Sequence, residues 1–206
     1  MGALIDHGIA QRAFPGESVS GDRAVVKPFP SGVLMAAVDG LGHGEPAAAA
    51  AAVAIDTLEN HAEEEPQELV RRCHEALKRT RGVAMSLASI DARSGMMTWL
   101  GVGNVEGLLL RTASSPPTRE ALLMRGGVVG YQLPPLRISH LPFGLGDLLV
   151  FATDGIRSDF AAGLPLADPL LRHQDVQEIA DRLLAHFGRM TDDALVLVAR
   201  DAGNAP

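Results

Sequence analysis

Several aspartates of this chain stand beside short apolar runs that are typical of buried strands. They are Asp39, Asp154 and the adjacent pair Asp192 and Asp193. A buried strand is rigid, so a carboxylate at its end is held with little freedom. Carboxylates that meet repel one another unless a cation lies between them, and oxygen ligands favour hard ions such as Mg²⁺ or Mn²⁺. The pattern predicts a divalent-metal site.

Each of these motifs also has a plainer interpretation. Asp39 and Asp154 are both followed by glycine, and Asp-Gly is a common turn dipeptide, so either residue alone fits a turn. Asp192 and Asp193 fit this interpretation less well, because two neighbouring negative charges before an apolar strand destabilise the fold unless they are paired or solvated.

A glycine-rich segment, Asp39-Gly40-Leu41-Gly42-His43-Gly44, leads from a predicted strand into a predicted helix. Its glycines let the backbone approach an ion or a phosphate closely. Such a turn is also typical of dinucleotide-binding folds, but the third glycine of that motif would stand where the chain has Glu45. His43 is either a proton donor beside the ion or a solvated loop residue.

The elements that must position these residues follow from hydrophobic periodicity and turn residues. The order of elements lacks regular strand–helix alternation, so the sequence predicts an α+β fold and disfavours a doubly wound parallel sheet. Asp175 is expected to cap the last helix. The predicted strands are 23–26, 33–39, 83–90, 96–102, 106–111, 122–124, 136–141, 148–153 and 194–199, and the predicted helices are 47–59, 66–81 and 176–187.

Length and composition favour one domain over residues 1–200, with a loop at 112–119 and a C-terminal tail at 201–206. Of the 206 residues, 47% are hydrophobic and 21% are charged, so the chain can build both a core and a polar surface. The single cysteine, Cys73, excludes an intramolecular disulfide or a Cys-rich zinc site, and a buried thiol is expected.

Charge and hydropathy exclude further classes of function. The net charge is −7 and only 4% of the residues are aromatic, which argues against nucleic-acid binding. The start of the chain has no signal-peptide pattern, and the apolar run 47–55 is too short to span a bilayer. We therefore expect a cytoplasmic protein with no membrane contact.

Taken in order along nearly the whole chain, these motifs resemble the metal-dependent Ser/Thr protein phosphatases, the PPM family. The likeness is strongest to its compact bacterial branch, which includes the stage II sporulation phosphatase and the RsbX-type stressosome phosphatase. The short chain without a sensor segment favours the RsbX type. Other segments that agree are 18–22, 101–104, 107–111 and 145–156.

The resemblance implies a four-layer α-β-β-α sandwich of two antiparallel sheets flanked by helices, with the metal site at one edge. It implies that Asp39 bridges two Mn²⁺ or Mg²⁺ ions, that the Gly40 carbonyl completes one shell and that Asp154 holds one ion. The ligand of the last motif corresponds to Asp192, with Asp193 as the fallback.

Other site residues follow less directly from the resemblance. Asp22 would order a metal-bound water from outside the ligand shell. Asn104 corresponds to no fixed family position. The phosphate-binding residue is left open, with Arg12 and Arg23 as the candidates.

The resemblance further implies a phosphatase that hydrolyses phosphoserine or phosphothreonine on a bacterial stress-signalling protein of stressosome or anti-sigma-antagonist type. His43 would then protonate the leaving oxygen. The sequence lacks a nucleophilic Ser or Cys motif, in agreement with direct attack by metal-activated water. The alternatives are a non-catalytic binding module with this fold and, third, a dinucleotide-binding oxidoreductase.

Overall fold

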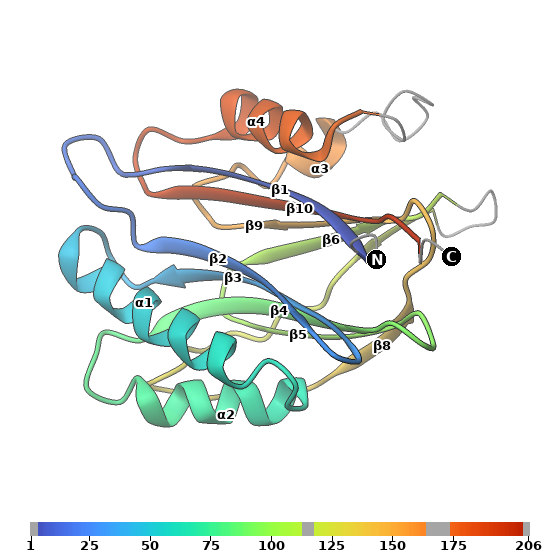
Figure 1. Cartoon of the computed structure of the whole chain (residues 1–206). Coiled ribbons are helices and arrows are strands. Elements are labelled where there is room, and N and C mark those ends of the chain that lie inside the picture. Colours follow the sequence, from blue (N-terminus) through green and yellow to red (C-terminus); the bar gives the residue numbers. More distant parts are fainter. Residues whose placement is uncertain (1–3, 113–117, 164–173, 204–206) are drawn as a thin grey trace.

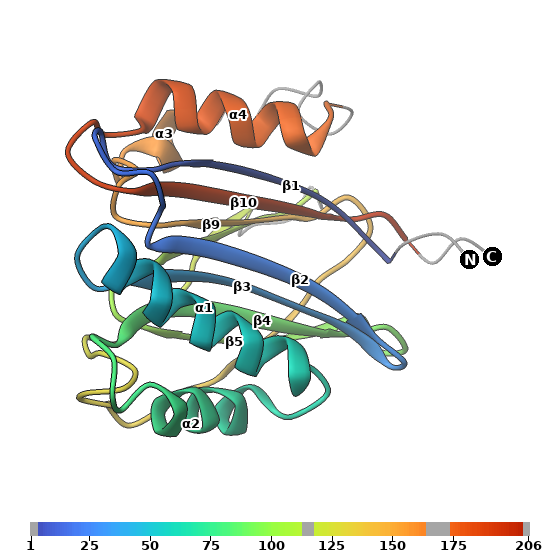
Figure 2. The ribbon, with the colours of Figure 1, turned by 60° about the vertical axis from the view of Figure 1, so that its left-hand side comes forward.

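The computed structural model describes residues 4–112, 118–163 and 174–203, and within them two antiparallel sheets are packed face to face (Figure 1). Helices α1 and α2 cover the outer face of one sheet, and α4 covers the outer face of the other (Figure 2). The α+β class and the four-layer α-β-β-α sandwich are thereby confirmed. Because the sheets are antiparallel, they do not form the doubly wound parallel sheet typical of dinucleotide-binding proteins.

Strand order places early and late segments of the chain side by side. One sheet has the order β1-β10-β9-β6-β7 and the other has the order β2-β3-β4-β5-β8. The strands of the first are β1 (Ile5–Arg12), β10 (Ala194–Asp201), β9 (Leu148–Ala152), β6 (Glu106–Leu110) and β7 (Arg119–Ala121). Those of the second are β2 (Asp22–Phe29), β3 (Gly32–Gly40), β4 (Val83–Asp91), β5 (Met96–Val102) and β8 (Ser139–Pro142).

The central strands are apolar throughout because both of their faces are covered. In β3, Leu34, Ala36 and Val38 pack under the helices. The alternate residues Met35 and Ala37 pack between the two sheets. Asp39 continues this second set by strand alternation, so its side chain lies on the inter-sheet face at the end of the strand.

The helices are α1 (Glu45–Asn60), α2 (Pro66–Ala76), α3 (Phe160–Gly163) and α4 (Val176–Phe187). Helix α1 buries a face made largely of alanine, which allows a close approach to the sheet. A side chain at Gly40 would have its Cβ 2.3 Å from the Ala47 carbonyl oxygen, so this glycine is required for the contact. At α4, Asp175 accepts hydrogen bonds from the Gln177 and Glu178 backbone N–H groups, confirming the predicted cap.

The structure also corrects several predicted elements. Strand β1 was not predicted, the predicted strand 122–124 is wrong because β7 ends at Ala121, and α2 ends at Ala76 rather than at residue 81. Asp201 belongs to β10 and pairs with Ile5, so it is not part of a tail. Within the predicted loop 112–119, residues 113–117 lie outside the described part. Over the described residues, no helix has the length and apolar character needed to cross a membrane.

Candidate metal centre

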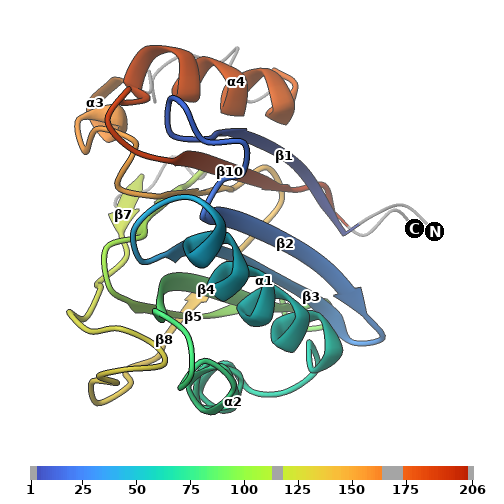
Figure 3. The same cartoon turned by 90° about the vertical axis from the view of Figure 1, so that its left-hand side faces the viewer.

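The predicted carboxylates lie at one edge of the sandwich, where β3 and β9 end and β2 and β10 begin; Figure 3 looks onto this edge. Asp22 on β2 pairs in register with Asp39 on β3. Directly opposed residues of antiparallel strands are close neighbours, so the two carboxylates lie close to each other. This pair is the buried half of the candidate site.

Burial and mutual repulsion dominate the electrostatics of this pair. Burial first, and then the neighbouring carboxylate of Asp39, raise the pKa of Asp22 to about 8. Burial first, and then the carboxylates of Asp154 and Asp192, raise the pKa of Asp39 to about 7. The repulsion therefore involves five aspartates in one region of the structure, which are Asp22, Asp39, Asp154, Asp192 and Asp193.

Asp154 follows β9 and contributes an exposed carboxylate at the rim. The Asn104 side-chain amide donates a hydrogen bond of 2.6 Å to Asp154 Oδ2, and its hydrogen bond to Asp39 lowers the pKa of that carboxyl. Next to it in the chain, the Thr153 hydroxyl donates to Asp22 Oδ2 over 2.7 Å. Asn104 therefore connects carboxylates from the two sheets, and Thr153 connects the Asp22 carboxylate to the end of β9.

The adjacent aspartates of the last motif have different roles. Asp193 is buried, and its two carboxylate oxygens accept hydrogen bonds from the backbone N–H groups of Phe14 (2.8 Å) and Gly21 (2.9 Å). Asp192 is only partly buried, and burial and the charge of Asp154 raise its pKa. Asp192 therefore has the carboxylate that faces the other acids, while both oxygens of Asp193, the fallback, are occupied by the backbone.

The glycine-rich turn places His43 at the same rim. Gly42 and Gly44 have φ values of 89° and 70°, which favour glycine. His43 Nδ1 lies 2.8 Å from Glu17 Oε1, and the ring stacks on Phe14 with centroids 4.8 Å apart. His43 also lowers the pKa of Asp192, so its ring lies within electrostatic reach of the acids.

The donor set fits a hard divalent cation. Asp39, Asp154 and Asp192 offer oxygen only, and no ion pair joins any of them to a lysine or arginine in the described parts of the chain. Over the same residues, no three His, Cys, Asp or Glu side chains are already closed around one point in a metal-ligand arrangement. The carboxylates are close enough for their charges to repel one another, but they do not surround a single point.

Sequence reasoning missed the connecting residues. Asn104 follows Gly103, whose φ of 95° belongs to the turn that orients the Asn104 side chain. An asparagine after a glycine is common in turns, so the sequence alone did not identify it as a site residue. Arg12 and Arg23 are not brought to the carboxylates. The Arg12 guanidinium donates to the Arg189 carbonyl, and Arg23 is exposed on β2 and makes no ion pair with an acid of the site among the described residues.

Without metal, the chain is expected to become less stable as the pH rises from about 5 to 8. The raised pKa values of Asp22 and Asp39 mean that the folded state binds more protons than the unfolded state in this window, so stability is lost on deprotonation. We expect a loss of roughly 2–4 kcal/mol, measured by denaturant unfolding in EDTA.

Asp22→Asn provides the control for this pH dependence. The variant should show a smaller dependence, and Mg²⁺ should restore the wild-type protein most at the higher pH. A wild-type stability that is flat or rises over this range would contradict the repulsion inferred for the cluster.

Comparisons with known proteins identify the family of this chain. The family model described as Stage II sporulation protein E (SpoIIE) matches residues 30–201. The phosphoserine phosphatase RsbX of Bacillus subtilis (strain 168) is 26% identical over 187 residues, which cover 90% of this chain and 89% of that protein.

Solved structures extend the likeness to the fold. One similar chain comes from a structural study of the bacterial stressosome, described there as a modular system that has been adapted to control secondary messenger signalling. It superposes with a TM-score of 0.85 and is 31% identical, and the match covers 95% of this chain and 99% of that chain. RsbX in complex with magnesium has a TM-score of 0.81 and 24% identity, covering 95% and 94%. These matches confirm the resemblance found in the sequence. The chain belongs to the stage II sporulation protein E (SpoIIE) family, within the PP2C-type protein-serine/threonine phosphatases.

Proposed function

We propose that this chain removes phosphate from phosphoserine or phosphothreonine on a cytoplasmic bacterial stress-signalling protein, of stressosome or anti-sigma-antagonist type. The observation that carries the proposal is the convergence of Asp39, Asp154 and Asp192 at one edge of a PP2C-type sandwich with no cationic side chain paired to them in the described residues. The RsbX likeness supports the choice of substrate class.

In this proposal, two Mn²⁺ or Mg²⁺ ions are held by Asp39, Asp154 and Asp192, with the Gly40 carbonyl as a further ligand. When bound, such ions lower the pKa of a water molecule and neutralise the phosphoryl oxygens. Asp22 orients water from behind Asp39, and Asn104 holds the Asp154 carboxylate toward the site.

His43 is proposed to donate the proton to the leaving serine or threonine oxygen. Its Nδ1 is engaged by Glu17, so Nε2 is the nitrogen available to the substrate. An alkoxide is a poor leaving group, and a positioned acid relieves the charge that develops on it. The site groups come from both sheets, and we propose that residues 1–200 act as one functional unit.

The test is phosphate release from a phosphoserine peptide and from a phosphorylated stressosome-type regulatory protein, after EDTA treatment and after addition of Mn²⁺ or Mg²⁺. We expect EDTA to lower turnover at least about a hundredfold, since several kcal/mol of charge stabilisation are lost. A phosphotyrosine peptide should be a poor substrate. Tight binding of the phosphoprotein without turnover at saturating metal would instead identify a non-catalytic binding module.

A further inference from the structure

Two segments of the chain are basic in a protein that is acidic overall. Residues 76–90 and 121–146 contain no aspartate or glutamate, although the chain as a whole has a net charge of −7. The lysines and arginines of these segments, all of them exposed, are Lys78, Arg79, Arg81, Arg125 and Arg137. An anionic partner therefore meets less electrostatic repulsion at these segments than over the surface as a whole.

The two segments lie side by side next to the metal centre. Val83, the first residue of β4, pairs with Gly40 of β3 on one side and exchanges two backbone hydrogen bonds of 2.9 Å with Val129 on the other. Neighbouring strands are about 4.8 Å apart, so Val129 lies roughly 10 Å from Gly40, the residue that follows Asp39. Figure 3, which looks onto the metal edge, shows the segment between β7 and β8 near β4 and α2.

Arg81 lies against the glycine-rich turn of the candidate site. A Cβ atom on Gly42 would be only 2.6 Å from Arg81 Nη1, so the guanidinium lies close to the backbone of this turn. The Leu41 N–H donates a hydrogen bond of 3.1 Å to the Gly82 carbonyl, which joins the segment before β4 to the same turn. The positive charge of Arg81 is therefore held at the rim, beside the turn that carries His43.

Arg125 is joined to the same edge through Asn104. The Arg125 carbonyl accepts a hydrogen bond of 2.8 Å from the Gly103 N–H. The next residue, Asn104, donates to Asp154 Oδ2 over 2.6 Å and also to Asp39. Arg125 is therefore bonded to the immediate neighbour of the side chain that connects two of the proposed metal ligands.

The arginines nearest the site have no acidic partner within the described parts of the chain. Lys78 pairs with Glu75 over 2.6 Å. Arg79, Arg81 and Arg125 form no ion pair with any described residue. An unpaired guanidinium can bind a carboxylate or a phosphate through two parallel hydrogen bonds. These three side chains are thus available to anionic groups of a partner.

An exposed tyrosine accompanies the arginines. Tyr131 is 83% exposed at the tip of a turn in which Val128 pairs with Gln132. The turn is attached to α2, because the Gly130 N–H donates a hydrogen bond of 2.9 Å to His74 Nδ1. Tyrosine and arginine are enriched among the residues that dominate binding energy at protein interfaces. The composition of this surface therefore suits a protein partner.

We propose that residues 79–82 and 125–131, which we call the basic strip, dock the folded phosphoprotein substrate through an acidic surface beside its phosphosite. The inference rests on the proposed phosphatase function and adds the surface that recognises the substrate. A specific interface covers about 800 Å² on each partner. A protein with its phosphoserine at the metal centre therefore also covers a strip roughly 10 Å away, which a small phosphate ester does not reach.

The test compares kcat/KM for an intact phosphorylated stressosome-type regulatory protein with kcat/KM for a small aryl phosphate, both at saturating Mn²⁺. The ratio of the two values separates docking from the chemical step. We expect Arg81→Ala and Arg125→Ala each to lower this ratio about threefold and the double variant about tenfold, mainly through KM, as for exposed charge pairs. Tyr131→Ala should lower it about tenfold. Added salt should lower the wild-type ratio more than that of the double variant.

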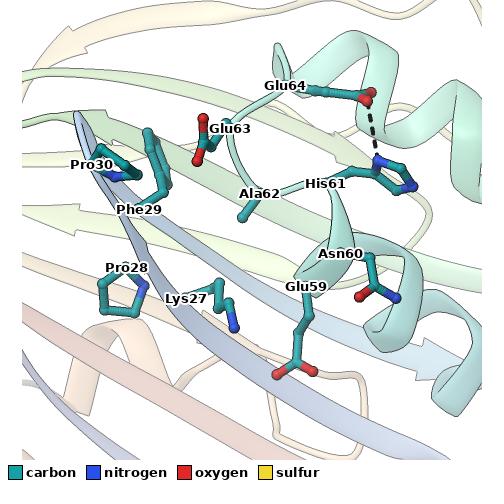
Figure 4. A pocket seen from close by; sticks show the side chains of 10 residues that line it. All are labelled: Lys27, Pro28, Phe29, Pro30, Glu59, Asn60, His61, Ala62, Glu63 and Glu64. Atoms are coloured by element: carbon teal, nitrogen blue, oxygen red, sulfur yellow. Dashed lines mark ion pairs between the residues drawn. The ribbon is translucent and has the colours of Figure 1, made fainter.

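Lys27→Ala provides a matched control for the single arginine variants. Lys27 is an exposed cation of β2 that lines a separate hollow with Phe29, Glu59 and His61 (Figure 4). It lies five residues along the strand from Asp22, which is about 17 Å. The variant removes one positive charge far from the basic strip, and it should keep the wild-type ratio.

Two outcomes would overturn the docking surface alone: an unchanged ratio in the double variant, or an equal loss in Lys27→Ala. Turnover of the aryl phosphate but not of the phosphoprotein would instead overturn the proposed substrate class, and the docking surface with it. If the wild-type protein with Mn²⁺ released phosphate from neither, the proposed phosphatase function itself would fail. The failure of the docking surface is therefore distinguishable from the failure of the function.

Discussion

Replacing Asp39 with asparagine is expected to lower Mn²⁺-dependent phosphoserine hydrolysis by at least about a thousandfold, because in the proposed site Asp39 is shared between two ions and the loss of its charge would weaken both ion sites together. The fold should survive, since asparagine has nearly the same shape and removes a carboxylate whose pKa burial and repulsion raise to about 7. In EDTA at pH 8, the variant should be at least as stable as the wild type. Phosphate release over a range of metal concentrations, with unfolding of the same samples, measures both effects.

Asp154→Asn is the natural comparison for this variant. Asp154 is exposed at the rim, and in the proposed site it would hold one ion only. Its loss should raise the metal concentration needed for half-maximal activity, with much of the turnover recovered at high metal. Substantial turnover by Asp39→Asn at saturating metal would show that Asp39 is not the shared ligand.

Replacing Asp193 with alanine is expected to destabilise the fold by about 3 kcal/mol or more, because two backbone N–H groups lose charged acceptors. These bonds hold the segment between β1 and β2, which carries Phe14 and Glu17 to His43. Asp193→Asn keeps one acceptor oxygen and should lose less stability. Denaturant unfolding in EDTA isolates this effect from metal binding.

Asp192→Asn should give the opposite profile, with stability retained and metal affinity weakened. The two variants together decide the register of the last motif. If Asp193→Asn proved more damaging to metal affinity than Asp192→Asn, while Asp192→Asn unfolded the chain, the roles assigned to the two residues would be exchanged.

The sequence predicted those elements whose residue pattern is set by a single physical requirement, such as burial on both faces. Strand β3 and strand β10 are covered on both faces, so their continuous apolar runs could be found, and the aspartates at their ends were found with them. Helix α4 has an apolar stripe and a capping Asp175, and its bounds were predicted correctly. The identity and the sequence positions of the carboxylates in the candidate site could therefore be predicted.

The features of the fold and of the candidate site that the sequence did not predict depend on contacts between distant segments of the chain. Strand β1 is an edge strand with few apolar residues, and its Gly8 is explained only by α4, because a Cβ there would lie 2.5 Å from the Gln177 Cα. The different roles of Asp192 and Asp193 are set by Phe14 and Gly21, which are far away in the chain. The local sequence pattern gives no information about such distant partners.

The position of β10 has a consequence for the order in which the molecule can assemble. This strand is synthesised last among the described elements, yet it lies between β1 and β9 and pairs with both. Until it leaves the ribosome, β1 and β9 present open edges that can pair with other chains. Asp192 lies just before this strand, so a nascent chain without this segment lacks both a complete sheet and one carboxylate of the proposed metal site. Catalytic competence should therefore appear only after β10 has joined the sheet.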